Sequence, residues 1–149
     1  MTDPTALTAW PRVRRVLNMV NLTTPTGLLV AAVGHAARRP GPDGLTLAEG
    51  YRFRFPTGGA FTVGNVVITR LTFADLTRRW PNLLRHEARH ATQYAILGVL
   101  FWPTYAATMG WSLLRTGDRA ARCALERWAG LADGGYEDVP PRRVCRPSR

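Results

Sequence analysis

The residues with the clearest chemical potential form the pentapeptide HEARH, which spans residues 86–90. In a helix, positions i and i+4 project from one face, so His86 and His90 could bind one divalent metal ion. Glu87 then has the position of a general base, because its carboxylate can reach a water molecule at the metal without being a ligand. The chain has only three histidines and four glutamates, so this placement is informative. Two histidines packed and hydrogen-bonded in the core are the alternative interpretation.

A catalytic zinc site needs a third protein ligand and an open coordination position. Glu126 is the best candidate, because it follows His90 by 36 residues and lies in a predicted amphipathic helix over residues 118–132. Mostly small residues share or border its face of this helix, at offsets of three, four and seven, which would allow a close approach to the HEARH helix. They are Ala120, Cys123, Gly130 and Asp133. The alternative is a solvent-exposed Glu126 that pairs with the arginines around it.

Two separated motifs resemble those of a known class of enzymes. HEARH followed by ERWA at residues 126–129 resembles the HExxH…ExxA pattern of gluzincin metallopeptidases, particularly the small two-helix minigluzincins. Further segments resemble a group of small uncharacterised bacterial proteins, a likeness that extends from about residue 16 to residue 136. They are NLTTP (21–25), GNVVI (64–68), RHATQY (89–94), FWPTY (101–105) and ERWAGLADGGY (126–136). The gluzincin resemblance implies zinc ligation by His86, His90 and Glu126, with Glu87 as the base.

The sequence also departs from the gluzincin pattern. Arg89 lies between the two histidines and Arg85 precedes them, where metallopeptidases favour uncharged residues. An aspartate soon after the third ligand often orients a histidine in larger relatives, and here the nearest is Asp133, two turns beyond Glu126. These departures argue against proteolytic activity more than against metal binding.

A zinc-dependent hydrolase would also need groups that hold the substrate and its developing oxyanion. In such an enzyme, zinc would activate water for attack on a peptide carbonyl, with Glu87 accepting the proton. We expect a strand beside the cleft to hold an extended peptide by backbone hydrogen bonds. The predicted strand consists of Val66, Val67 and Ile68. Tyr136 is the preferred oxyanion donor, because it follows the Glu126 helix; the other available phenols are Tyr94 and Tyr105.

The elements that must position these residues follow from periodicity and from turn residues. The pattern predicts helices at 8–19, 26–37, 81–98, 103–115 and 118–132. Alternating aromatics predict a strand at 51–55, which a turn at 56–59 joins to a β-branched strand at 61–69 that bends at Gly64. The order predicts an α+β fold, a mainly helical single domain with a small antiparallel sheet before the HEARH helix. We expect a single metallopeptidase-like domain over residues 1–137 and a mobile, Pro/Arg-rich tail over 138–149.

Composition restricts the class of protein further. The net charge is +10 and all twenty basic residues are arginine, yet 46% of the chain is hydrophobic, which excludes a disordered basic tail. The arginines are spread over helix edges, a turn and the tail, without a groove of interleaved aromatics, which argues against nucleic-acid binding. Two cysteines, Cys123 and Cys145, are too few for a disulfide framework.

Two uncharged runs, 16–37 and 91–114, raise the question of a membrane. Polar residues and prolines interrupt both, so they are interpreted as buried helices or as helices on an anionic membrane surface, rather than as two spans. Trp102 and Trp111 are expected to pack in the core, with a membrane-interface position as the alternative. The prediction is a cytoplasmic protein, with peripheral membrane attachment left open.

Two hypotheses follow for function. The first is a zinc-dependent metallopeptidase-like protein that hydrolyses a peptide or protein substrate. The second is a catalytically inactive, metal-stabilised domain that acts as a membrane-surface or protein-interaction module. Replacing Glu87 distinguishes them, because only an enzyme depends on the base.

Overall fold

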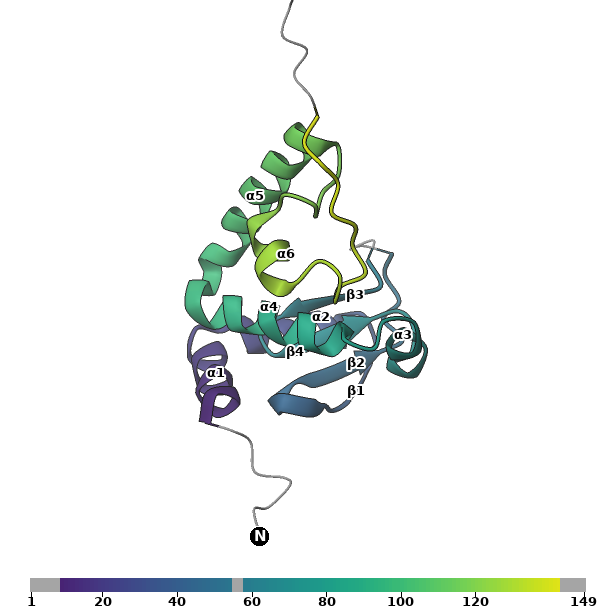
Figure 1. The fold of residues 1–149 in the computed structure, drawn as a ribbon. Coiled ribbons are helices and arrows are strands. Elements are labelled where there is room, and N and C mark those ends of the chain that lie inside the picture. The colour runs from purple at the N-terminus through teal and green to yellow at the C-terminus, as the bar shows by residue number, and fades with distance from the viewer. Residues whose placement is uncertain (1–8, 55–57, 143–149) are drawn as a thin grey trace, which may run out of the picture.

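A computed structural model of the protein describes residues 9–54 and 58–142. In chain order the elements are α1 (Ala9–Val20), α2 (Thr23–Val33), β1 (Ala37–Pro40), η1 (Pro42–Gly44), β2 (Thr46–Glu49), β3 (Ala60–Val63), β4 (Val66–Thr69), α3 (Phe73–Arg79), α4 (Leu83–Leu97), η2 (Gly98–Leu100), α5 (Phe101–Thr116) and α6 (Ala124–Ala129). The four strands precede α4, the helix that contains HEARH (Figure 1). The predicted α+β domain, mainly helical with a small sheet, is confirmed.

The sheet is mixed, with the strand order β1-β2-β4-β3. The β1–β2 and β3–β4 pairs are antiparallel, as expected, whereas β2 and β4 pair in parallel. The prediction of a wholly antiparallel sheet is therefore wrong for one pairing. The physical reason is the position of the β3–β4 hairpin in the sheet. Its second strand, β4, lies next to β2 and runs in the same direction as β2, while β3 forms the outer edge.

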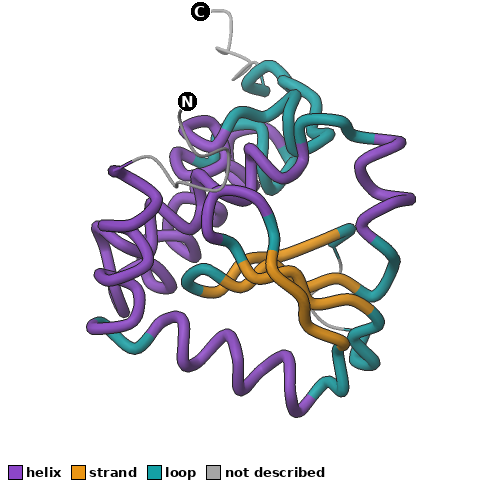
Figure 2. Tube along the Cα trace, turned by 90° about the horizontal axis from the view of Figure 1, so that it is seen from below, coloured by secondary structure: helices purple, strands orange, loops and turns teal. Residues whose placement is uncertain are grey.

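Helices cover both faces of the sheet, and β4 lies between β2 and β3, so it is buried on every side. Val66 and Ile68 pack in one cluster with Ala31 of α2, whereas Val67 packs in another with Leu83 and Ala91 of α4. This division follows from the alternation of side chains along a strand. Figure 2 shows helical segments on both sides of the strands.

The hairpin is not the one that the sequence predicts. Residues 51–54 form no strand, and Phe55 lies outside the described residues. Tyr51 is buried instead against the α2 side of the sheet. The run 61–69 divides into β3 and β4 at Gly64, whose φ of +60° favours glycine. A Cβ atom on Gly64 would also collide with the backbone nitrogen of Thr24, so the turn packs directly against the start of α2.

The helix predictions are confirmed for four of five segments, with shifted ends. The prediction of a helix over 118–132 is wrong, because α6 contains only Ala124–Ala129. Asp118 Oδ1 accepts hydrogen bonds from the backbone nitrogens of Ala120 and Ala121, each at 2.8 Å, and this turn delays the helix. Gly130, with φ +90°, ends it.

The uncharged runs form surface helices as well as core. Within residues 9–54 and 58–142, no single helix has the length and hydropathy of a membrane span. Helices α1 and α2 meet these criteria only as a pair that is bent by 76°. Trp102 and Trp111 are 51% and 57% exposed, so the prediction that they pack in the core is wrong.

The described part of the expected tail contacts the domain. Asp138 forms ion pairs with Arg122 and Arg127, and the backbone nitrogen of Arg142 donates to the carbonyl of Arg115. Residues 143–149, including Cys145, lie outside the described residues.

Candidate metal centre

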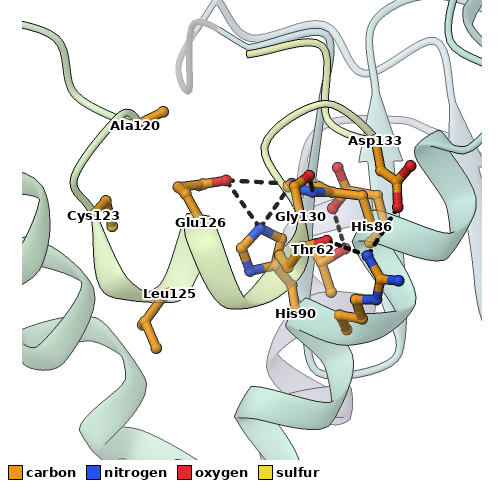
Figure 3. Close-up of polar contacts among 12 residues, drawn as sticks. Thr62, His86, His90, Ala120, Cys123, Leu125, Glu126, Gly130 and Asp133 are labelled. Atoms are coloured by element: carbon orange, nitrogen blue, oxygen red, sulfur yellow. Dashed lines mark hydrogen bonds and ion pairs between the residues drawn. The ribbon is translucent and has the colours of Figure 1, made fainter. Parts of the chain in front are cut away.

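Three buried side chains from two helices point toward one another at the centre of the site. His86 and His90 project from α4, and Glu126 projects from α6 toward both imidazoles (Figure 3). The two Nε2 atoms are 3.0 Å apart, and Glu126 Oε2 lies 3.3 Å from His86 Nε2 and 3.5 Å from His90 Nε2. We call these three residues the metal triad. The structure brings together the three ligands that the sequence predicts, and the group could hold a metal ion.

The size of this triangle matches a small tetrahedral ion. Zinc binds imidazole nitrogen and carboxylate oxygen at roughly 2.0–2.1 Å, which places neighbouring ligand atoms about 3.3–3.4 Å apart in a tetrahedron. The three separations in the triad, 3.0, 3.3 and 3.5 Å, bracket this value. Within the part of the chain that the structure describes, the group contains no fourth His, Cys, Asp or Glu. Three ligands leave one tetrahedral position for water or substrate.

Hydrogen bonds on the far side of each imidazole fix which nitrogen can bind a cation. His86 Nδ1 lies 3.0 Å from the carbonyl oxygen of Gly130, which can only accept, so Nδ1 carries the proton. His90 Nδ1 lies 2.8 Å from Gln93 Oε1, and Gln93 Nε2 donates to the carbonyl of Leu125, which fixes the amide orientation. His90 Nδ1 is therefore also a donor. In the neutral rings both Nε2 lone pairs point into the triad, as metal ligation requires.

Glu126 is held by a group that the sequence did not assign to this role. Tyr105, on α5, donates a hydrogen bond of 2.6 Å to Glu126 Oε1. Glu126 Oε2 accepts no hydrogen bond from the described residues and is left for a cation. The alternative of a solvent-exposed Glu126 paired with arginine is wrong: Glu126 is 2% exposed, and Arg122 and Arg127 pair with Asp138.

The charges in this buried group favour a cation. Burial raises the pKa of Glu126, but hydrogen bonds from the imidazoles of His86 and His90 in their protonated form, and from the phenol of Tyr105, lower it by more, so without a metal ion the pKa lies well below its usual range. Burial lowers the pKa of His90, but the carboxylates of Glu126 and Glu87 outweigh burial and raise it. A buried carboxylate thus stays ionised, and only a proton or a metal ion compensates its charge.

The predicted base lies beside the triad on the same helix. Glu87 is buried, and the hydroxyl of Thr62 donates a hydrogen bond of 2.6 Å to its Oε2. Thr62 belongs to β3, the outer strand next to β4. This contact orients Glu87 and leaves its Oε1 available for another partner.

The two arginines that depart from the gluzincin pattern have a structural role. Arg85 donates to both carboxylate oxygens of Asp133, at 3.0 Å each, and Arg89 donates to Asp133 Oδ2 at 2.9 Å. Arg89 also donates to the carbonyl of Ala129. Asp133 thus orients no histidine here; it receives two guanidinium groups that join α4 to the segment after α6.

That segment passes very close to the first ligand. A Cβ atom on Gly134 would lie 2.6 Å from His86 Cε1, so only glycine allows the backbone to cover the imidazole in this way. The contact, together with the Gly130 carbonyl, restricts the orientation of His86 from two sides.

Of the three candidate phenols, only Tyr136 remains available to a substrate. The ring of Tyr94 is fully buried and stacks on Phe101, with centroids 3.8 Å apart, and Tyr105 is engaged by Glu126. The ring centroid of Tyr136 lies 5.9 Å from that of His86, and its side chain is 41% exposed. Burial, Glu126 and Glu87 all raise the pKa of Tyr136, so its hydroxyl stays protonated as a hydrogen-bond donor.

The predicted substrate-binding strand is wrong. Val66, Val67 and Ile68 are fully buried, and β4 pairs with β2 on one side and with β3 on the other. An extended peptide therefore finds no unpaired edge on β4. The outer strand on the side of the metal triad is β3, which carries Thr62.

Sequence reasoning missed several residues that shape the site. Gln93 had a detectable signal, because it follows His90 by one helical turn. Thr62, Gly134 and the Asp133 contacts had none, because each reaches α4 from a segment more than twenty residues away. The sequence suggests Tyr105 only as an oxyanion donor, whereas its hydroxyl holds Glu126, the predicted third ligand.

Comparison with known proteins adds no relative. No protein-family model matches the chain, and no curated protein or solved structure matches it.

Proposed function

We propose that the protein is a zinc-dependent, gluzincin-like metallopeptidase that hydrolyses a peptide or protein substrate. The observation that carries the proposal is a triad of three buried ligands whose unprotonated atoms converge at tetrahedral spacing, with Glu87 adjacent to the first ligand. Two imidazoles and one carboxylate favour zinc over calcium and magnesium, which prefer oxygen ligands. The resemblance of HEARH and ERWA to the gluzincin motifs supports the same conclusion.

A zinc ion held by the triad would polarise a substrate carbonyl and increase the acidity of a nearby water molecule. Glu87, oriented by Thr62, accepts the proton of the attacking water and delivers it to the leaving amine. The hydroxyl of Tyr136 donates a hydrogen bond to the carbonyl oxygen as negative charge develops there. The substrate pairs in an extended form with the outer edge of β3, the strand that carries Thr62.

The second candidate is a metal-stabilised domain without catalysis. One specific observation favours it: the residues of the triad are only 2%, 7% and 2% exposed, as in a closed structural site. The lack of a fourth ligand among the described residues favours the catalytic alternative, because structural zinc sites are almost always four-coordinate protein sites.

The deciding experiment combines metal content with hydrolysis. Protein purified with zinc is analysed for bound metal, and hydrolysis is measured on a quenched fluorescent peptide library. Glu87→Gln should keep one zinc ion per chain and reduce hydrolysis by roughly a hundredfold or more, the usual contribution of a general base. Glu137→Gln, at an exposed glutamate, is the matched control and should change neither quantity.

Two results would contradict the proposal. If Glu87→Gln hydrolyses peptides as well as the unchanged protein, Glu87 is not the base. If the zinc-loaded protein hydrolyses no member of the library but loses its fold when zinc is removed, the metal is structural and the second candidate is correct.

A further inference from the structure

Two connections between helices, the α1–α2 turn and the α4–α5 corner, lie side by side at one corner of the molecule. They are far apart in the sequence but contact each other. Asn21, between α1 and α2, donates a hydrogen bond of 2.9 Å from Nδ2 to the carbonyl of Tyr94 near the end of α4. The same side chain packs beside Gly98, where η2 begins. In Figure 1 the α1–α2 turn and the α4–α5 corner meet at the left edge.

Large apolar side chains project into solvent from both of these connections and from the helix ends beside them. We call them the apolar corner: Val20, Leu22, Ile96, Val99, Leu100 and Trp102, which are between 51% and 76% exposed. Leu22 has a φ of +64°, a left-handed conformation that a leucine rarely adopts. A strained backbone that presents an apolar side chain to water indicates a functional rather than a packing role.

The chain segments that form the apolar corner carry basic side chains and no acidic ones. Residues 9–42 and 88–117 contain no aspartate or glutamate. Arg12 and Arg15 are exposed on α1, where Arg12 shares a face with Val16 and Val20 at helical spacing. Arg15 also lines an open cavity of about 500 Å³ together with Arg38 and with Arg39, which pairs with Glu49. An apolar surface whose own segments carry arginine and no carboxylate is complementary to an anionic lipid surface.

We propose that the apolar corner docks onto membranes that contain anionic phospholipids. Val99, Leu100 and Leu22 enter the boundary between headgroups and acyl chains, and Trp102 lies at the level of the headgroups. Arg12 and Arg15 contact lipid phosphates. The inference concerns a surface separate from the metal triad and does not depend on the proposed hydrolysis.

Sedimentation of the full chain with lipid vesicles tests this docking. We expect binding to vesicles of phosphatidylcholine mixed with phosphatidylglycerol, and little binding to phosphatidylcholine alone. Val99→Glu/Leu100→Glu should weaken binding by about a hundredfold or more, because each apolar side chain contributes roughly tenfold when buried. Arg12→Gln/Arg15→Gln should weaken it by roughly tenfold or more at low salt. On the mixed vesicles, the tryptophan emission should shift to the blue, and Trp102→Phe should reduce that shift.

The matched control places the same charge on exposed leucines outside the apolar corner. Leu71→Glu/Leu114→Glu should bind the mixed vesicles like the unchanged protein, since Leu71 follows β4 and Leu114 lies near the far end of α5. Circular dichroism and zinc content should be the same in all variants.

Three results would overturn the proposal. The first is equal binding by the Val99→Glu/Leu100→Glu variant and its control, and the second is equal binding to both kinds of vesicle. The third is a chain that forms a dimer in size-exclusion chromatography, loses it through Val99→Glu/Leu100→Glu and does not sediment with vesicles. In that case a second copy covers the apolar corner.

Discussion

Helix α4 contacts two buried polar clusters whose hydrogen bonding differs. On one side is the metal triad of His86, His90 and Glu126. On the other is a group that we call the Arg14 cluster, formed by Arg14 and Asn18 of α1 with Asn65 of the β3–β4 turn. Both are almost fully buried, so in both clusters polar groups have lost their hydrogen bonds to water and need other partners.

In the Arg14 cluster, buried donors are paired with buried acceptors. Arg14 donates to Asn65 Oδ1 at 3.1 Å, to the carbonyl of Ala88 at 3.1 Å and to the carbonyl of Asp43. Asn18 donates to the carbonyl of Ala91 at 2.9 Å. Among the described residues of this cluster, one buried atom, Asn65 Nδ2, lacks a partner.

The metal triad instead brings acceptors together. Two imidazole lone pairs and one carboxylate oxygen converge, and their own protons are directed outward to Gly130 and Gln93. The difference teaches that burial of polar residues alone does not mark a functional site. What distinguishes the triad is that its hydrogen bonding is complete everywhere except at the point where a cation fits.

The largest expected effect separates the two clusters by their response to zinc. Zinc at a thousandfold excess over its Kd should raise the stability of the protein by about 4 kcal/mol, an increase in Tm of roughly 10–15 °C. His86→Ala should abolish this zinc-dependent increase, because two ligands remain. Differential scanning calorimetry with and without a chelator measures it.

The control is His35→Ala, which removes the histidine outside the triad. Its Tm should still rise with zinc as in the unchanged protein. A full zinc-dependent increase in His86→Ala would show that zinc binds elsewhere.

The next effect tests the Arg14 cluster. Arg14→Leu leaves Asn65 Oδ1 and two carbonyl oxygens without this donor, so it should lower the free energy of unfolding by about 2–4 kcal/mol. The loss should be the same with and without zinc, because the cluster holds no ligand. Urea denaturation measures both values.

Arg15→Leu removes a neighbouring exposed arginine and should change stability by less than about 0.5 kcal/mol. If the loss in the free energy of unfolding caused by Arg14→Leu depends strongly on zinc, the two clusters are not independent and the contrast between them is wrong.

A smaller effect concerns the group that holds Glu126. Tyr105→Phe keeps the ring but removes the hydrogen bond to Glu126 Oε1, so zinc affinity should fall by about ten- to a hundredfold. Competition with a chelating dye measures the Kd. Tyr51→Phe, in the separate hydrophobic cluster under α2, should leave the Kd unchanged. An unaltered Kd in Tyr105→Phe would falsify the positioning role.

The smallest effect involves Asp133 and has a defined pH dependence. Hydrogen bonds from Arg85 and Arg89 lower the pKa of Asp133 below its usual value, although partial burial opposes them. Since the folded-state pKa is the lower one, the stabilisation is complete above the unfolded pKa of roughly 3.9 and disappears as the pH falls through the folded value. Asp133→Asn should therefore cost about 1 kcal/mol at pH 7 and nothing in strong acid.

Asp138→Asn is its matched control, because Asp138 also receives two arginines but its side chain is 58% exposed, against 15% for Asp133. Its cost at pH 7 should be smaller. A stability difference for Asp133→Asn that persists unchanged in acid would show that the carboxylate charge is not responsible.

The fold could be predicted from the sequence where the signal is local. Periodicity located the helices around α4 and α5, and Gly98 and Gly117 marked their ends. Prediction failed where a distant contact decides the conformation. Tyr51 fits a strand pattern but packs against Gly34, and the β3–β4 turn forms where Gly64 meets the start of α2.

The candidate site divides in the same way. The sequence by itself determined that His86, Glu87 and His90 lie on one helix, and that both histidines share a face, because the rise and rotation of a helix fix these relations locally. It also indicated Glu126 by motif and by the small residues near it. The prediction of Val66, Val67 and Ile68 as the substrate strand was wrong, because their sequence does not reveal that other strands pair with β4 on both sides.

Only the tertiary structure decided the rest. The distances between Glu126 and the imidazoles, the hydrogen bond from Tyr105, the contact of Thr62 with Glu87 and the close approach of Gly134 all join segments separated by twenty to fifty residues. Such contacts depend on how α4, α5, α6 and β3 pack, and packing is a property of the whole core rather than of any local pattern. The HEARH motif thus supplied two ligand atoms, and the fold placed the third among them.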